Sequence, residues 1–332
     1  MVRIAINGFG RIGRTSARII FDQLGEKAEL VAVNDLTDNK TLAHLLKYDT
    51  QYREFGHEVS YDEDHLIIDG KKINSYSEKE PSKLPWAEDK IDVVLECTGR
   101  FTDPESAKGH IQAGAKRVVI SAPPKGEVST YVIGVNADKL DDEEIVSNAS
   151  CTTNCIMPVA DVMNKNFGIA KAMMTTIHSY TADQNLQDGP HKDLRRARAA
   201  AENIVPTSTG AAKSAGAVIP ELKGIFDGLS LRVPTVVVSL SDFTIVTKKK
   251  TTVEDVNQAF REAAESPLLK GILEVTDQEL VSSDFVGNPA SAIVDLNLTQ
   301  VIDGDLVKIV AWYDNEYGYS NRLVELAVMA GR

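Results

Sequence analysis

The sequence predicts an α/β protein that begins with a doubly wound parallel sheet and continues as an α+β unit with a mainly antiparallel sheet. Up to about residue 150, short apolar runs alternate with stretches of helical periodicity, which is typical of βαβ units. Beyond that point, longer alternating runs are joined by an Asp-Gly pair, which is typical of hairpins.

The length of 332 residues suits about two domains. We expect the first over residues 1–150 and the second over residues 151–315. A terminal helix over about residues 316–332 is amphipathic, and we expect it to pack back on the first domain.

The first predicted element is a strand over Val2–Ile6, followed by a glycine-rich turn. Gly8, Gly10 and Gly13 have the spacing G-x-G-x-x-G and precede a stretch with helical periodicity. In a Rossmann-type domain the first glycine permits a tight turn, the second lets the backbone approach a pyrophosphate, and the third lets the helix pack on the strand. The alternative is a tight turn without a ligand, so the next strand decides.

That next strand, ELVAVND, ends at Asp35, about 20 residues beyond the last glycine. A carboxylate at this place accepts hydrogen bonds from an adenosine ribose. It also repels a 2′-phosphate, so we predict NAD rather than NADP. The alternative, a solvated strand end, is disfavoured because strand, turn, helix and carboxylate occur in order.

Further strands are expected at IDVVLECTG, RVVISAP and TYVIGVN, with a helix at DPESAKGHIQAGA. The strand ends place Thr98 and Ser121 at the ligand edge of the sheet, although both residues are equally suited to capping the segments that follow. Asp69-Gly70 predicts a hairpin, which we expect to be an antiparallel insertion rather than a crossover.

Cys151 lies where a strand-like run stops and a helix-like run begins. We expect the helix start to lower the pKa of this thiol, and Cys155, among apolar residues, to be buried and inert. Two core cysteines are the alternative. A disulfide is disfavoured in a reducing compartment, and a zinc site lacks a second ligand pair nearby. His178, at the end of a later strand-like run, is the candidate base.

Small hydroxyls, glycine N–H groups and guanidinium groups recur after His178. These groups bind phosphate oxygens, and here they are Thr181, Arg196, Thr209, Gly210 and Arg232. For the arginine-rich stretch, a solvated basic helix face is the alternative.

The last third predicts three strands and two helices. The strands are SLSDFTIVTKK, SAIVDLNLTQ and DLVKIVAWYD, the last two joined at Asp303-Gly304. The helices are TVEDVNQAFREAAES, with an acidic first turn, and the stretch after Ser320.

Charge and composition exclude several classes of partner. With 48 acidic and 36 basic side chains the net charge is −12, which repels polyanions and acidic membrane surfaces, so we expect neither nucleic acid nor membrane as a partner. No apolar run reaches the roughly 20 residues of a membrane span, and we expect no secretory signal. Three cysteines suit reduced thiols in the cytoplasm.

Six segments together resemble one family. They are INGFGRIGR, NDLTD, SCTTNC, HSYT, DLRRARAAAENIVPTSTGAAK and WYDNEYGYSNR. In this wording and order the chain resembles the phosphorylating glyceraldehyde-3-phosphate dehydrogenase family from its first strand to its last helix.

The resemblance implies a mechanism. Cys151 attacks the aldehyde to give a thiohemiacetal, His178 activates the thiol and takes a proton, and NAD receives the hydride. Inorganic phosphate then releases the thioester as an acyl phosphate. We expect D-glyceraldehyde 3-phosphate as substrate, glycolysis as the setting and, as in the family, a homotetramer.

The resemblance also implies further site residues. The substrate phosphate is assigned to Thr181 and Arg232 with Arg196 nearby, and the attacking phosphate to Ser150, Thr152, Thr209 and Gly210. For the cofactor the family positions add Arg11, Ile12, Lys79 and Asn315 to Gly8, Gly10, Gly13, Asp35, Thr98 and Ser121, and Asn315 holds the nicotinamide amide.

Two other functions remain open from the sequence. One is an erythrose-4-phosphate dehydrogenase, which differs in pocket size and phosphate reach. The other is a nucleotide-binding interaction protein without the chemistry.

Overall fold

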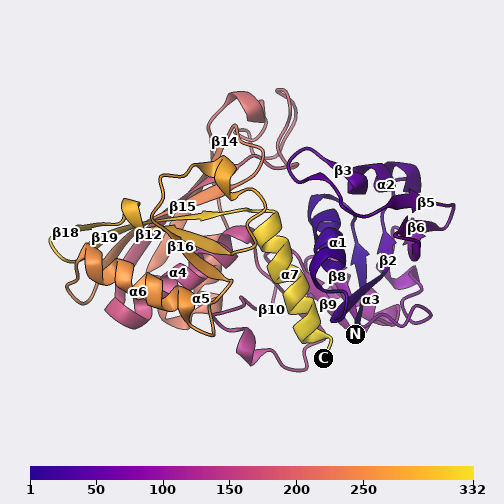
Figure 1. The fold of residues 1–332 in the computed structure, drawn as a ribbon, viewed down its shortest axis with the longest axis horizontal. Coiled ribbons are helices and arrows are strands. Elements are labelled where there is room, and N and C mark those ends of the chain that lie inside the picture. Colours follow the sequence, from indigo (N-terminus) through magenta and orange to yellow (C-terminus); the bar gives the residue numbers. More distant parts are fainter. The chain divides into compact units, whose positions relative to one another are not determined.

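The structure, a computed structural model, describes residues 1–212 and 214–332, which form two compact units. Unit 1 comprises Met1–Tyr131, Lys139–Ser150 and Ser320–Arg332, and unit 2 comprises Val132–Asp138 and Cys151–Tyr319. A nine-stranded sheet belongs to unit 1 and an eight-stranded sheet to unit 2, and both can be followed in Figure 1.

The sheet of unit 1 has the order β10-β11-β9-β8-β1-β2-β7-β6-β5. At its centre β1 (Val2–Asn7) pairs in parallel with β2 (Ala28–Asn34) on one side and with β8 (Val93–Glu96) on the other. The chain therefore changes direction across the sheet between β1 and β8, where doubly wound sheets bind ligands at the carboxyl ends of their strands. The other strands are β5 (Val59–Tyr61), β6 (His65–Ile68), β7 (Lys71–Tyr76), β9 (Arg117–Ile120), β10 (Ser129–Thr130) and β11 (Ile145–Ser147).

Local sequence explains the helices of unit 1. α1 (Arg11–Gln23) starts after Gly10 and is buried on all sides from Thr15 to Ile20. α2 (Asn39–Lys47) is capped by Asp38, which accepts from the backbone N–H of Thr41. α3 (Pro104–Gln112) has an aspartate cap and proline in its first turn. A separate short ribbon joins β3 (Tyr48–Asp49) to β4 (Arg53–Glu54).

The hairpin predicted at Asp69-Gly70 is confirmed, but its place in the sheet is not that of a simple insertion. β6 and β7 pair antiparallel, and Asp69 and Gly70 both have positive φ, 49° and 77°. However, β7 also pairs in parallel with β2. The path from β2 through α2 to β7 is thus a crossover, and the expectation of an insertion without one is wrong.

The prediction of a strand at TYVIGVN is also wrong. β10 ends at Thr130, and the backbone N–H groups of Val135 and Asn136 both donate to the carbonyl of Val132. The side chain of Asn136 accepts from the N–H of Val132 at 2.8 Å. A side-chain-closed turn therefore replaces the extended chain that the apolar residues suggest.

The sheet of unit 2 is mainly antiparallel, as predicted. Its order is β13-β14-β12-β15-β19-β17-β16, with β18 paired to β19. The long central strand β12 (Ile169–Ser179) pairs antiparallel with β15 (Ser239–Thr247) and in parallel with β14 (Phe226–Val233). The others are β13 (Val205–Ser208), β16 (Leu273–Thr276), β17 (Ala292–Asp295), β18 (Gln300–Ile302) and β19 (Leu306–Tyr313).

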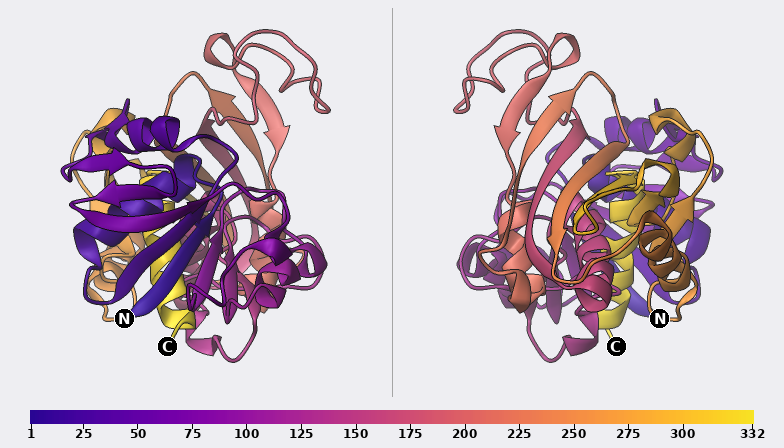
Figure 2. Two further views of the ribbon diagram at one scale, coloured as in Figure 1. Left: turned by 90° about the vertical axis from the view of Figure 1, so that its right-hand side faces the viewer. Right: turned by 90° about the vertical axis from the view of Figure 1, so that its left-hand side faces the viewer.

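Three helices cover one face of this sheet; they are labelled in Figure 1, and the right-hand view of Figure 2 shows them beside the strands. α4 (Cys151–Phe167) contacts four of its strands and both neighbouring helices, α5 (Ala211–Val218) and α6 (Val253–Glu265). The acidic start of α6 forms a capping box between Thr252 and Asp255.

The last helix, α7 (Tyr317–Ala330), lies within the predicted range of about residues 316–332. Its residues from Ser320 onward belong to unit 1, where a Cβ on Gly331 would lie 2.3 Å from a methyl carbon of Val2. Among the helices of the described residues, none combines the length and the apolar run that crossing a bilayer requires.

Candidate active site

A cavity of about 530 Å³ opens at the carboxyl ends of β1, β2 and β8, and we call it the glycine pocket. This is the place that the strand order favours for a ligand. Among the residues that line it are Asn7, Gly8, Gly10, Asp35, Lys79 and Thr98.

The three motif glycines have different surroundings. Gly8 has φ +91°, and a Cβ there would lie 2.7 Å from the backbone nitrogen of Thr98. A Cβ on Gly13 would lie 2.3 Å from the carbonyl oxygen of Gly8. Gly10, which precedes α1, has no atom within 4 Å of the Cβ position. Two glycines therefore allow close packing, and the third leaves the helix start open to a ligand, which fits a dinucleotide pyrophosphate.

Asp35 lies in the wall of the glycine pocket, at the end of β2. Its Oδ2 accepts from the N–H of Phe9 at 2.8 Å and its Oδ1 from the N–H of Thr37 at 3.0 Å. These bonds fix the carboxylate, and each oxygen retains a lone pair for a ribose hydroxyl.

Of the other residues expected at the cofactor, two line the glycine pocket and one has a different partner. Lys79 and Thr98 line the glycine pocket. Arg11 instead pairs with Asp49 and lies 5.7 Å from the ring centre of Tyr52.

The remaining three positions lie in separate settings. Ile12 is in the first turn of α1, and Ser121 follows β9, where its N–H donates to the carbonyl of Glu96 at 3.0 Å. Asn315 belongs to unit 2, where it accepts from the hydroxyl of Ser239 at 3.1 Å.

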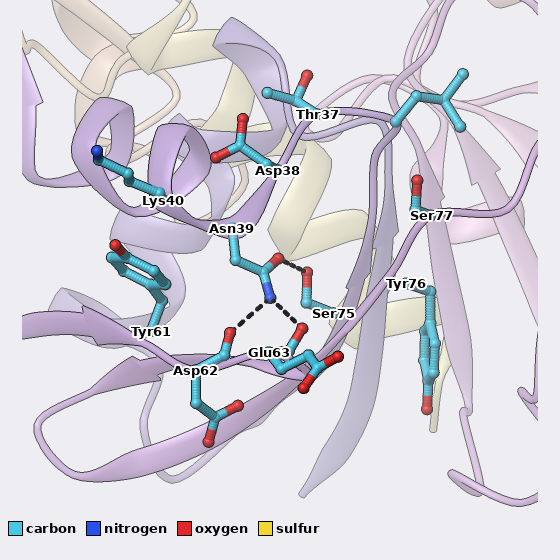
Figure 3. A pocket seen from close by; sticks show the side chains of 11 residues that line it. Thr37, Asp38, Asn39, Lys40, Tyr61, Asp62, Glu63, Ser75, Tyr76 and Ser77 are labelled. Carbon is cyan, nitrogen blue, oxygen red and sulfur yellow. Dashed lines mark hydrogen bonds between the residues drawn. The ribbon is translucent and has the colours of Figure 1, made fainter.

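A second cavity of unit 1, of about 590 Å³, lies beside α2. Figure 3 shows Asn39 at its centre, donating to the carbonyls of Asp62 and Glu63 and accepting from the hydroxyl of Ser75. Because carboxylates of Asp38, Asp62 and Glu63 line it, this cavity does not suit a phosphate-bearing ligand.

In unit 2, Cys151 and His178 face one another. Cys151 is the first residue of α4, and His178 lies next to the end of the central strand β12. Sγ of Cys151 is 3.5 Å from Nε2 of His178. This is the arrangement of a nucleophile and its base.

The pKa values of the pair differ from the predicted lowering of the Cys151 thiol pKa. Burial raises the pKa of Cys151, although the charge of Arg232, the Thr152 hydroxyl and the N–H groups at the helix start lower it in part. The expectation that the helix start sets a lowered thiol pKa is therefore wrong, because desolvation outweighs it. Burial, followed by the charge of Arg232, lowers the pKa of His178 to about 3. A neutral thiol thus faces a neutral imidazole.

The two ring nitrogens of His178 have different neighbours. Its Nδ1 lies 2.7 Å from the carbonyl of Ser179, which can only accept, and 2.9 Å from NH1 of Arg232, which can only donate. Nε2 faces Cys151, and for it to act as the base the ring proton has to lie on Nδ1, toward Ser179. The same NH1 of Arg232 donates to Ser179 O at 3.0 Å and to the Thr181 hydroxyl at 3.3 Å.

Arg232 has the character of an anion-binding residue. Its Nε is buried without a hydrogen-bond partner among the described residues, so the guanidinium has donor capacity to spare. Arg196 lies in the same region and pairs with Asp183, which also accepts from the Thr181 hydroxyl. Asp183 was not among the predicted site residues, and the one sequence signal for it is its position two residues after Thr181.

Thr152 is held by a residue that the sequence did not single out. The hydroxyl of Tyr313 lies 2.9 Å from that of Thr152 and 2.8 Å from that of Thr176. Tyr313 is 1% exposed and its ring meets His178 edge-on, with 6.1 Å between the ring centres. The Thr152 hydroxyl is therefore engaged in the interior of unit 2.

Thr209 and Gly210 form the start of α5. The Thr209 hydroxyl accepts from the N–H of Ala211 at 3.2 Å, and Gly210 is the exposed cap residue. Ser150 directly precedes α4. Helix starts with small residues are suited to anions.

The other two cysteines also have raised thiol pKa values. Burial raises the pKa of Cys97 to about 12, and it raises the pKa of Cys155 further. Cys155 is fully buried, as predicted for the packing thiol.

Two family profiles match the chain. The one described as glyceraldehyde 3-phosphate dehydrogenase, NAD binding domain, matches residues 2–104. The one described as glyceraldehyde 3-phosphate dehydrogenase, C-terminal domain, matches residues 150–315.

Curated relatives match over nearly the whole length. Identity is 53% over 332 residues to glyceraldehyde-3-phosphate dehydrogenase of Streptomyces coelicolor, covering 99% of this chain and 98% of the relative. It is 55% over 338 residues to that of Mycolicibacterium smegmatis, covering 100% and 99%. It is 54% over 330 residues to glyceraldehyde-3-phosphate dehydrogenase 2 of Trichormus variabilis, covering 98% of each.

Proposed function

Because the chain belongs to the glyceraldehyde-3-phosphate dehydrogenase family, we propose that it oxidises D-glyceraldehyde 3-phosphate with NAD and inorganic phosphate to 1,3-bisphosphoglycerate, in glycolysis. The observation that carries the proposal is the thiol of Cys151 facing Nε2 of His178 with an arginine at the other ring nitrogen. Erythrose 4-phosphate oxidation and a purely nucleotide-binding role gain no support from the relatives, each of which is named for glyceraldehyde 3-phosphate.

The residues of the glycine pocket fit NAD. The open helix start at Gly10 suits the pyrophosphate, and the carboxylate of Asp35 suits an unphosphorylated ribose. We assign the remaining cofactor contacts to the residues that the family pattern marks, with Asn315 at the nicotinamide amide. When bound, NAD supplies the hydride acceptor.

The Cys151–His178 pair performs the covalent steps. Nε2 of His178 takes the thiol proton as Sγ bonds to the aldehyde carbon, and the imidazolium then protonates the carbonyl oxygen to give a thiohemiacetal. The same nitrogen, neutral again, takes that proton back as the carbon is oxidised to a thioester. A phosphate oxygen then attacks the carbonyl carbon and the sulfur leaves. One demanding oxidation is thereby divided into two steps.

Arg232 and Thr181 are assigned to the substrate phosphate, with Arg196 beside them. The unpartnered Nε of Arg232 and its position next to His178 support this assignment. The starts of α4 and α5, at Ser150, Thr152, Thr209 and Gly210, are assigned to the attacking phosphate.

The decisive experiment is NADH formation from glyceraldehyde 3-phosphate and NAD, with and without inorganic phosphate. Steady turnover is expected only with phosphate, because the thioester otherwise remains on Cys151. Cys151→Ser is expected to abolish turnover, whereas Cys155→Ser is the matched control and is expected to retain it. Near-normal turnover by Cys151→Ser would refute the mechanism.

We also propose a homotetramer. The sheet face of unit 2 that lies opposite its helices carries exposed apolar side chains, with Met173 59% and Leu229 43% exposed. The segment after β12 adds Leu186 and Leu194, which are 83% and 81% exposed. Apolar surface of this kind is typical of subunit interfaces. A sedimentation profile with monomer alone would overturn the proposal.

Two further assignments concern the domain bounds and the cellular location. We propose residues 1–150 with the terminal helix as the NAD-binding domain and residues 151–315 as the catalytic domain. We place the protein in the cytoplasm, where its three free cysteines stay reduced. Fractionation of cells that express a tagged chain tests this location.

A further inference from the structure

A buried hydrogen-bonded cluster lies at the inner wall of the glycine pocket, and the reaction steps above leave it without a role. Glu96 is the last residue of β8 and His110 lies on α3, and both side chains are 0% exposed. An apolar side chain would fill this space without the desolvation that a carboxylate suffers. The contribution of Glu96 therefore comes from the hydrogen bonds that its carboxylate accepts.

The two oxygens of Glu96 accept hydrogen bonds from different parts of the pocket wall. Oε2 accepts from Nδ2 of Asn7 at 2.6 Å and lies 3.0 Å from Nε2 of His110. Oε1 accepts from the backbone N–H of Thr98 at 2.8 Å and from the Thr98 hydroxyl. One oxygen is thus anchored in the core, and the other fixes the segment against which Gly8 packs.

Asn7 extends the cluster to the opposite wall. Its Oδ1 accepts from Nδ2 of Asn34 at 2.7 Å, and Asn34 exchanges two bonds with the backbone of Glu78, at 2.8 and 2.9 Å. Asn7, Asn34 and Glu78 all line the glycine pocket. One carboxylate thereby links the ends of β1, β2 and β8 to the segment after β7.

Trp86 fixes the direction of the histidine. Its indole N–H donates to Nδ1 of His110 at 3.0 Å. An indole nitrogen can only donate, so Nδ1 accepts and the ring proton lies on Nε2, toward Glu96. His110 is therefore a donor of fixed direction to the carboxylate.

We propose that Glu96 and His110 are positioning residues for NAD, acting through Thr98, Asn7 and Asn34 without touching the cofactor. This inference rests on the proposed NAD-binding role of the glycine pocket. It requires that changes at Glu96 or His110 weaken NAD binding while the chemistry at Cys151 stays intact.

Glu96→Gln tests the carboxylate. An amide presents an NH₂ group to one of the two sets of donors, so one wall of the pocket is released. The dissociation constant of NAD, measured by calorimetry, is expected to rise by about tenfold or more. The rate of Cys151 alkylation, the turnover at saturating NAD and the KM for glyceraldehyde 3-phosphate are expected to stay unchanged.

A matched pair at His110 separates hydrogen bonding from packing. His110→Gln retains a donor and an acceptor, so NAD affinity is expected to stay near that of the unmodified protein. His110→Leu keeps the volume without the donor, and the dissociation constant is expected to rise about fivefold. Where His110→Leu does not fold, Trp86→Phe takes its place, because freeing Nδ1 lets the ring proton leave Nε2 and is expected to weaken NAD binding likewise.

The outcomes are distinguishable. Equal NAD affinity of the unmodified protein and folded Glu96→Gln overturns the inference, and so does equal weakening by His110→Gln and His110→Leu. If Glu96→Gln does not fold, the His110 comparison decides. If the unmodified protein binds no NAD, the proposed function fails instead.

Discussion

NH1 of Arg232 lies 2.9 Å from Nδ1 of His178, so a permanent cation adjoins the ring that must accept a proton. After burial, this charge is the main reason that the pKa of His178 falls to about 3. A bound phosphate dianion offsets the arginine charge. We therefore expect the substrate to make its own base stronger when it binds.

Arg232→Met is expected to raise the pKa of His178, because the positive neighbour is gone while burial remains. It is also expected to raise the KM for glyceraldehyde 3-phosphate by about tenfold to a hundredfold, since charge-assisted hydrogen bonds to phosphate are lost. Histidine NMR titration and steady-state kinetics measure the two effects. Arg261→Met, on α6 and paired with Asp277, is the control and is expected to change neither. An unchanged His178 titration in Arg232→Met would contradict the electrostatic account.

Asp35→Ala is expected to raise the ratio of NADP to NAD efficiency by about tenfold or more, because the carboxylate that repels a 2′-phosphate is removed. The measurement is kcat/KM for each cofactor. Asp38→Ala is the matched control, since Asp38 caps α2 beside the other cavity of unit 1, and its ratio is expected to stay constant. A constant ratio in Asp35→Ala would remove Asp35 from the ribose site.

Tyr313→Phe is expected to lower the free energy of unfolding by about 1–3 kcal/mol, because two buried threonine hydroxyls lose their common partner. Urea unfolding measures the change. Tyr61→Phe, at a tyrosine that is 46% exposed, is expected to unfold like the unmodified protein. Equal midpoints for the two variants would show that the Tyr313 hydroxyl contributes nothing to stability.

His57 is expected to make stability depend on pH. The carboxylate of Asp69, and that of Asp22 at the other ring nitrogen, raise the pKa of His57 above its ordinary 6.5. A raised histidine pKa adds stability in full below the ordinary value, and this part is lost as pH rises through the raised value. The gap in urea midpoint between the unmodified protein and His57→Gln should therefore shrink from about pH 6 to about pH 9. A gap that widens with pH would reverse the sign of the assignment.

Features set by neighbouring residues could be predicted from the sequence. The turn at Gly8 and Gly10, the carboxylate at Asp35 and the helix start at Cys151 follow from local spacing and periodicity. The position of His178 near the end of a strand likewise follows from the run of residues before it.

Features set by distant partners could not. The parallel pairing of β7 with β2 and the bond between Arg11 and Asp49 depend on segments that only the folded chain brings together. The raised pKa of Cys151 depends on desolvation, which has no local sequence pattern. The turn at Val132 was missed because the side chain of Asn136 competes with extended backbone.

Tyr313 lies 161 residues beyond Thr152, and its strand β19 pairs between β15 and β17 in the interior of the sheet. During synthesis the ribosome releases the nucleophile-bearing helix long before the strand that completes its support. Unit 2 therefore cannot complete its fold while only its amino-terminal part has been synthesised. Its folding requires nearly the whole polypeptide. A nascent chain that stops before this strand carries all three cysteines of the finished enzyme and yet lacks the organised centre.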